Sequence, residues 1–168
     1  SAMFFDGDDD HLIVGSSTDF DISPSDTFTI ELWLNRTVAD GSQQWTRVLS
    51  RDGAVTGWAL TYNGSGNSLE FGDDEGGTIL QSNYVTVVNR WYHVAVVRSS
   101  GDIKVFRDGV EKGSAWTHTT SLDANGGINI GKSHSTEFMA GYLDDFRLTK
   151  GVARYSSNFT PPTTSHYS

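Results

Sequence analysis

The sequence predicts an all-β fold, a sandwich of two antiparallel sheets, and three observations indicate it. Apolar side chains recur at every second position, most clearly at Phe28, Ile30, Leu32 and Leu34, which would share one face of a strand. The pair Asp108–Gly109 separates two β-rich runs, and Asp-Gly is a strong signal for a two-residue hairpin. Finally, Gly occurs 18 times, while amphipathic helical stretches longer than about two turns are absent from the sequence.

The predicted strands follow one another at short intervals. A three-strand meander is expected over 91–98, 103–107 and 110–113. Weaker runs predict further strands at 12–14, 47–50, 57–62, 68–71, 78–81, 127–131 and 141–148. Because crossover helices are missing between these runs, the strands must pair in antiparallel fashion. We expect one domain over residues 1–160 and an extended tail over 161–168.

Composition excludes several classes of function. The formal charge is -9 and the pI is near 4.8, so the surface would repel nucleic acid and anionic membranes, whereas it suits hard cations. The sequence contains no run of ~18 apolar residues, which argues against membrane insertion. It contains no Cys, which excludes disulfides, thiolate metal sites and thiol catalysis.

Several stretches, taken in order, resemble one known family. They are Phe5–Leu12, Phe28–Trp33, Trp91–Arg98, Val105–Gly109, Ile130–Gly131 and Phe138–Leu148. Together they resemble the laminin-G-like domains of the concanavalin-A-like lectin/glucanase superfamily, which implies a jelly-roll sandwich. That superfamily includes lectins, glycosidases and structural modules, so the resemblance implies a fold more than a function.

The end of the chain carries a narrower resemblance. Residues 143–162 are similar to the endings of laminin-G-like domains in phage tail, other virion surface and bacterial surface proteins. This resemblance implies an extracellular or virion-surface location.

Acidic residues are the first candidates for catalytic groups. Glycosidases of this fold place carboxylates at alternate strand positions, which brings them into one cleft. Here Glu70 and Asp73 differ by an odd step and precede two glycines, so we interpret 70–75 as a solvated hairpin tip. Asp144 and Asp145 are adjacent, so they point apart unless a β-bulge intervenes. The sequence therefore predicts a protein that is not an enzyme.

Other acidic residues indicate calcium. The run 6–10 is dense in carboxylates, and calcium takes six to eight oxygen ligands. The family resemblance implies a structural calcium near the sandwich edge, held by Asp10 together with Asp144 or Asp145. The alternative is that these residues are turn formers and surface charge.

Aromatic residues supply the candidate ligand-binding set. Trp45 and Trp116 lie in polar segments, and exposed indole rings suit sugar rings. Trp58, Tyr62 and Asn63 are further candidates, with Tyr62 and Asn63 expected on a loop. Each Trp could instead cover an edge of the core. The strand residues Trp33 and Trp91 match core positions of the family, so we expect them to pack inside.

The leading hypothesis is a non-catalytic carbohydrate-recognition module that binds a polysaccharide or cell-surface glycan and is stabilised by calcium. Two alternatives remain. The domain could be an assembly module whose partners are other virion or surface proteins, or, third, a glycan-degrading enzyme with an unfamiliar site.

Overall fold

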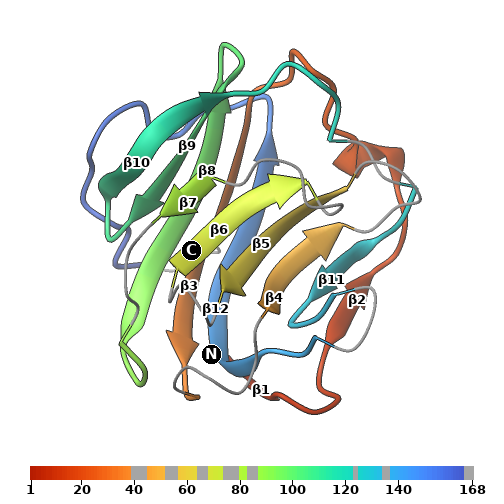
Figure 1. Ribbon diagram of the computed structural model, residues 1–168, viewed down its shortest axis with the longest axis vertical. Coiled ribbons are helices and arrows are strands. Elements are labelled where there is room, and N and C mark those ends of the chain that lie inside the picture. Colours follow the sequence, from red (N-terminus) through yellow and green to blue (C-terminus); the bar gives the residue numbers. More distant parts are fainter. Residues whose placement is uncertain are drawn as a thin grey trace.

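A computed structural model of the chain describes residues 1–38, 45–51, 57–63, 68–73, 80–82, 87–122, 125–133 and 137–164. Within them, two six-stranded antiparallel sheets are stacked face to face, as Figure 1 shows. The described helical structure is one 3-10 turn, η1 (Thr18–Phe20). Across the described residues, no helix is long and apolar enough to cross a membrane. The predicted antiparallel jelly-roll sandwich is therefore confirmed.

Each sheet joins strands from distant parts of the chain. Sheet A has the order β1 (Met3–Asp6), β12 (Ala140–Lys150), β3 (Phe28–Arg36), β8 (Trp91–Ser99), β9 (Asp102–Arg107), β10 (Val110–Thr117). Sheet B has the order β2 (Leu12–Val14), β11 (Ile128–Ile130), β4 (Trp45–Arg51), β5 (Trp58–Asn63), β6 (Ser68–Asp73), β7 (Leu80–Ser82). Strand β1 was not predicted, because it is short and buries only one of its side chains, Phe5.

The core lies between the sheets. The alternating side chains Phe28, Ile30 and Leu32 of β3 are fully buried and belong to one apolar cluster. From sheet B, Trp58 and Phe71 enter the same cluster. Each such side chain contributes about 1.5–3 kcal/mol when it leaves water. The period-two pattern in the sequence is thus the inner face of the sandwich.

The outer face of sheet A is covered in part by residues 151–164, which follow β12. Tyr155 and Phe159 of this C-terminal segment pack on Phe106, with their own rings stacked 3.5 Å apart. The Phe159 N–H donates to the carbonyl of Gly109, 2.8 Å away, in the predicted hairpin turn. Gly109 has φ +75, and a Cβ there would clash with the Phe159 carbonyl, so the turn and the segment both require this glycine.

Beneath the C-terminal segment lies a buried carboxylate, Glu31 of β3. Its Oε1 accepts from Arg147 Nη2 at 2.5 Å and lies 3.6 Å from Arg154 Nε. Its Oε2 accepts from the Tyr155 hydroxyl at 2.7 Å and lies 3.4 Å from His93 Nε2. We call Glu31 and these four partners the Glu31 cluster. It links Arg154 and Tyr155 of the C-terminal segment to β3 and β12.

Burial alone would raise the pKa of Glu31. The contacts with His93, Tyr155 and Arg147 outweigh that effect and lower this pKa from 4.5 to about 2. Burial and the Glu31 carboxylate raise the pKa of Tyr155 well above its usual range, so its hydroxyl stays protonated and keeps donating. The negative charge of Glu31 is thus maintained across the physiological pH range.

We expect acid to weaken the fold through Glu31. Because the pKa of Glu31 is depressed in the folded state, its stabilisation is fully present above about pH 4.5 and is lost as the pH falls toward about 2. The shift corresponds to about 3 kcal/mol of unfolding free energy. Denaturant unfolding of wild type and Glu31→Gln between these pH values measures the loss of unfolding free energy. The unfolding free energy of Glu31→Gln should depend much less on pH than that of wild type.

The matched control is Glu111→Gln, which alters a partly exposed pair with Lys104, 3.1 Å away in the same sheet. Its unfolding free energy should change by less than about 1 kcal/mol at neutral pH, against about 3 kcal/mol for Glu31→Gln. Equal and small effects of the two substitutions would contradict the assigned role of Glu31.

Candidate functional site

A bulge in β12 creates the most distinctive site. The register between β12 and β3 shifts between Asp144 and Arg147, and Asp145 has φ 53, a left-handed conformation that is uncommon for a non-glycine residue. The Asp145 N–H donates to Asp144 Oδ1 at 2.9 Å. Because the extra residue breaks the alternation, the two neighbouring carboxylates line one pocket instead of pointing to opposite faces.

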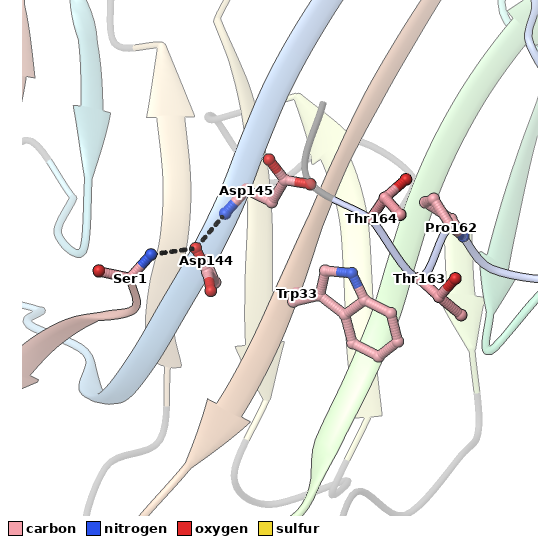
Figure 2. A pocket seen from close by; sticks show the side chains of 7 residues that line it. All are labelled: Ser1, Trp33, Asp144, Asp145, Pro162, Thr163 and Thr164. Carbon is pink, nitrogen blue, oxygen red and sulfur yellow. Dashed lines mark hydrogen bonds and ion pairs between the residues drawn. The ribbon is translucent and has the colours of Figure 1, made fainter. Parts of the chain in front are cut away.

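The pocket lies on the outer face of sheet A and encloses about 390 Å³. Figure 2 shows Trp33 of β3 between the two aspartates of β12 and the C-terminal segment. The lining residues are Ser1, Trp33, Asp144, Asp145, Pro162, Thr163 and Thr164. We call this the Trp33 pocket. Residues 161–164, predicted as a tail, thus run along the domain, and 165–168 lie outside the described residues.

The Trp33 pocket combines an apolar ring with charged and hydroxyl groups. The indole lies edge-on to His93, with 5.3 Å between ring centroids, which supports the ring from the sheet side. Across the strand pair, Asp144 lies opposite Trp33 in register, and its Oδ1 is 3.8 Å from the Ser1 ammonium. The pocket can therefore bind a molecule that has both an apolar face and several hydrogen-bonding groups.

The prediction that Trp33 and Trp91 pack inside was wrong. Trp33 is half-buried and Trp91 is 38% exposed, and both belong to the outer face of sheet A. Their neighbours Leu34 and Tyr92 are buried, so strict alternation places Trp33 and Trp91 on the other face. The strand alternation in the sequence already contains this signal, because Trp33 is out of phase with Phe28 and Ile30.

Three predicted ligand-binding residues are buried instead. Trp58 has no exposed surface and packs against Phe71, with 6.0 Å between ring centroids. Tyr62 is 1% exposed, and the Arg36 guanidinium lies 3.1 Å above its ring. Asn63 is buried and is the last residue of β5. The prediction of ligand contacts was wrong for these residues because β5 is a central strand that extends through Asn63 and is buried along its whole length.

Trp45 and Trp116 belong to strands of different sheets. Trp45 begins β4 of sheet B, whereas Trp116 lies near the end of β10 of sheet A. Trp116 is half-buried against the main core, 4.6 Å from the ring of His118. The Trp45 side chain lies outside the described residues. The prediction that Trp45 binds a ligand therefore stays a prediction.

Glu70 is not at a solvated hairpin tip as predicted. It lies within β6 and is 1% exposed. Its Oε1 accepts from Asn63 Nδ2 at 3.1 Å and from the Ser68 hydroxyl at 2.7 Å. Because β6 pairs with β5 on one side and with β7 on the other, Glu70 lies within sheet B and not at a turn.

The Asp-rich residues 6–10 form a compact acidic group. Ligand oxygens of Asp6, Asp9 and Asp10 lie within 4.8 Å of one another. Backbone N–H groups, first that of Asp8 at 2.9 Å, hydrogen-bond the carboxylate of Asp6 and lower its pKa. These exposed carboxylates are hard oxygen donors of the kind that calcium prefers.

Asp144 and Asp145 are not part of this acidic group. The carboxylate of Asp10 lies 3.2 Å from the Asp6 backbone nitrogen, and Asp6 pairs with Ala140. Asp144 is four residues further along β12, or about 13 Å at strand spacing, whereas calcium–oxygen distances are about 2.3–2.6 Å. The predicted sharing of one ion by Asp10 and Asp144 or Asp145 is therefore wrong.

Comparison with known proteins identifies the family. Residues 6–154 match the family model described as "Concanavalin A-like lectin/glucanases superfamily", so the chain belongs to this family. This finding confirms the resemblance stated from the sequence. A search of curated proteins finds no match.

Solved structures share the fold at low sequence identity. A Bacteroides ovatus protein to which carbohydrate binding has been ascribed is 22% identical, with a TM-score of 0.66, 90% of this chain covered and 44% of that one. Domain 4 of the arabinanase AbnA from Geobacillus stearothermophilus, in complex with arabinotriose, is 15% identical, with a TM-score of 0.62 and coverages of 85% and 68%. Mouse laminin α1 domains LG4-5 are 17% identical, with a TM-score of 0.62 and coverages of 95% and 44%. The chain thus spans less than half of the first and third of these proteins.

Calcium binding by the acidic group stays a prediction. At a calcium concentration about tenfold above a millimolar Kd, typical of extracellular modules, binding would add about 1.4 kcal/mol and raise Tm by about 3 °C. Asp10→Asn should abolish this rise, whereas the matched variant Asp144→Asn should retain it. Thermal unfolding with and without calcium measures the effect, and a wild-type Tm that calcium does not change would contradict the prediction.

Proposed function

We propose that this domain is a non-catalytic carbohydrate-binding module and that the Trp33 pocket is its binding site. The observation that supports this proposal best is the composition of the pocket: one indole ring, two carboxylates and two threonine hydroxyls lie around one cavity. The ligand is a polysaccharide or cell-surface glycan. Presentation on an extracellular or virion surface is part of the proposal and rests on the resemblance of residues 143–162.

The chemistry of sugars matches the two kinds of group in the pocket. The C–H face of a sugar ring packs on an indole, while its hydroxyls donate to carboxylates in charge-assisted hydrogen bonds. Strands β3 and β12 hold Trp33 and Asp144 on a paired sheet, and the Glu31 cluster holds the C-terminal segment nearby. A preorganised site of this kind loses little conformational entropy on binding.

The comparisons support the proposal at the level of the fold. The domain of AbnA, which shares the sandwich, was solved with arabinotriose, and the Bacteroides ovatus protein has carbohydrate binding ascribed to it. Enzymes also share the fold, among them an alginate lyase and a sialidase. The choice of a binding module therefore rests on the pocket and not on the fold.

Removal of the indole should weaken glycan binding. Trp33→Ala deletes the stacking surface, and a central Trp typically contributes about 2 kcal/mol, so Kd should rise at least about tenfold. A glycan array would first identify a polysaccharide that binds the wild type. Titration calorimetry with that polysaccharide then measures Kd for the variant.

Trp116→Ala is the matched control, because it removes a half-buried indole from β10, away from the pocket. It should leave Kd within about twofold of wild type. Loss of binding in Trp116→Ala with full binding in Trp33→Ala would overturn the assignment of the binding site to the Trp33 pocket. It would place the site on the surface around Trp116.

Glycan hydrolysis is the second candidate function, and the β12 bulge favours it. The bulge directs the carboxylates of both Asp144 and Asp145 to one pocket, and glycosidases use a pair of carboxyl groups. Release of reducing ends from the bound polysaccharide, abolished by Asp145→Asn, would establish hydrolysis in place of simple binding. Binding without any release over prolonged incubation would exclude it for that polysaccharide.

A further inference from the structure

A row of aromatic side chains crosses sheet A beside the Trp33 pocket. Phe4 of β1 pairs with Tyr142 of β12, Tyr142 with Asn35 of β3, and Asn35 with Trp91 of β8. The Phe4 and Tyr142 ring centroids are 5.0 Å apart, and those of Tyr142 and Trp91 are 6.3 Å apart. We call Phe4, Tyr142 and Trp91, together with the intervening Asn35, the aromatic row.

The three rings of the aromatic row face solvent. Phe4 is 53% exposed, Trp91 is 38% exposed and Tyr142 is 36% exposed. Their sequence neighbours Phe5, Tyr92 and Leu143 are buried, so the row belongs to the outer face of sheet A. Adjacent exposed aromatic side chains of this kind commonly mark a binding surface.

The aromatic row and the Trp33 pocket form one surface. Asn35 follows Trp33 by two residues on β3, and Tyr142 precedes Asp144 by two residues on β12. Residues two apart on a strand share a face and are separated by about 7 Å. A ligand that fills the pocket and extends beyond it by this distance therefore reaches the row.

The middle of the aromatic row carries an unsatisfied polar atom. Asn35 Oδ1 is shielded from solvent and has no hydrogen-bond partner among the described residues. An unpaired acceptor of this kind costs about 1–3 kcal/mol, which a hydroxyl donor from a ligand would recover after a small displacement of the flanking rings. A purely apolar partner would leave Asn35 unpaired.

We propose that the aromatic row extends the Trp33 pocket into a site for several consecutive units of one polysaccharide chain, and that this chain is neutral. The inference rests on the proposed function of the pocket. Rings on either side of an amide match a chain whose units offer C–H faces and hydroxyls in alternation. Continuity with the pocket favours a glycan over a protein partner for this face.

The charge of the surface selects a neutral chain. Among the described residues that line the pocket, the charged side chains are those of Asp144 and Asp145. The formal charge of the whole chain is -9. A uronic-acid or sialic-acid polymer would therefore be repelled, whereas a neutral chain is not.

The test is a length series measured by calorimetry. The probes are neutral cello-, xylo-, manno- and arabino-oligosaccharides from disaccharide to hexasaccharide, with oligogalacturonates as anionic probes. For the neutral series that binds, the hexasaccharide should bind at least about tenfold more tightly than the disaccharide, because it extends from the pocket across the row whereas the disaccharide is held in the pocket. Oligogalacturonates should bind at least about tenfold more weakly, most clearly at low ionic strength.

Variants separate the row from the pocket. Tyr142→Ala and Trp91→Ala should weaken the hexasaccharide about tenfold and leave the disaccharide within about twofold, whereas Trp33→Ala should weaken both. The thermal midpoint of each variant checks that it folds, and Phe4→Ala, at the sheet edge, provides an additional variant of the row.

The possible failures are distinguishable. If Trp33→Ala loses binding but the length of the oligosaccharide and the row substitutions have no effect, the proposed extension is overturned and the pocket assignment stands. Tighter binding of oligogalacturonates than of any neutral series would overturn the neutral-chain assignment. If the wild type binds none of these probes, the proposed function fails and the extension fails with it.

Discussion

The arrangement of the outer face of sheet A depends on the contacts of one buried carboxylate, that of Glu31. A charge without exposed surface is tolerated only when it is paired and hydrogen-bonded, and here the partners come from β12 and from the C-terminal segment. The same contacts that satisfy Glu31 hold residues 151–159 on the sheet. Pro162 and Thr163 follow directly and line the Trp33 pocket, so the pocket depends on an ion pair that lies outside it.

The bulge in β12 is the second determinant of the site. In a regular strand, adjacent residues point to opposite faces, which would direct one of Asp144 and Asp145 into the core. The left-handed backbone at Asp145 avoids that cost and places both carboxylates at the pocket. Bulges are known to redirect side chains near functional sites, and this one places acidic groups within reach of an indole on the adjacent strand.

The two proposals use different physical properties of one sheet face. In the pocket, charged and hydroxyl groups surround a single ring, which favours orientation and specificity. Along the aromatic row, three exposed rings come from β1, β12 and β8, which favours contact area over directionality. A face with both parts can bind one sugar unit in a defined pose and still gain affinity from the units that follow it.

Much of the fold could be predicted from the sequence. Alternating apolar residues such as those of 28–34 determine strands and their inner face, because the side-chain period of two is a local property. The Asp108–Gly109 hairpin, the acidic charge and the superfamily are likewise visible in the sequence. The candidate site is only partly visible in the sequence. The sequence singles out Asp144 and Asp145 as candidate calcium ligands, whereas it predicts that Trp33 packs in the core.

The tertiary structure alone decided what covers the outer faces. Residues 151–164 cross sheet A and bury Glu31, while Trp33 and Trp91, on that same face, keep part of their surface accessible. Trp58 is buried because sheet A packs over it in the common core, and Glu70 is buried because β6 is paired on both sides. The physical reason is that alternation specifies two faces for each strand, but only contacts between remote segments determine which parts of the outer face remain open to a ligand.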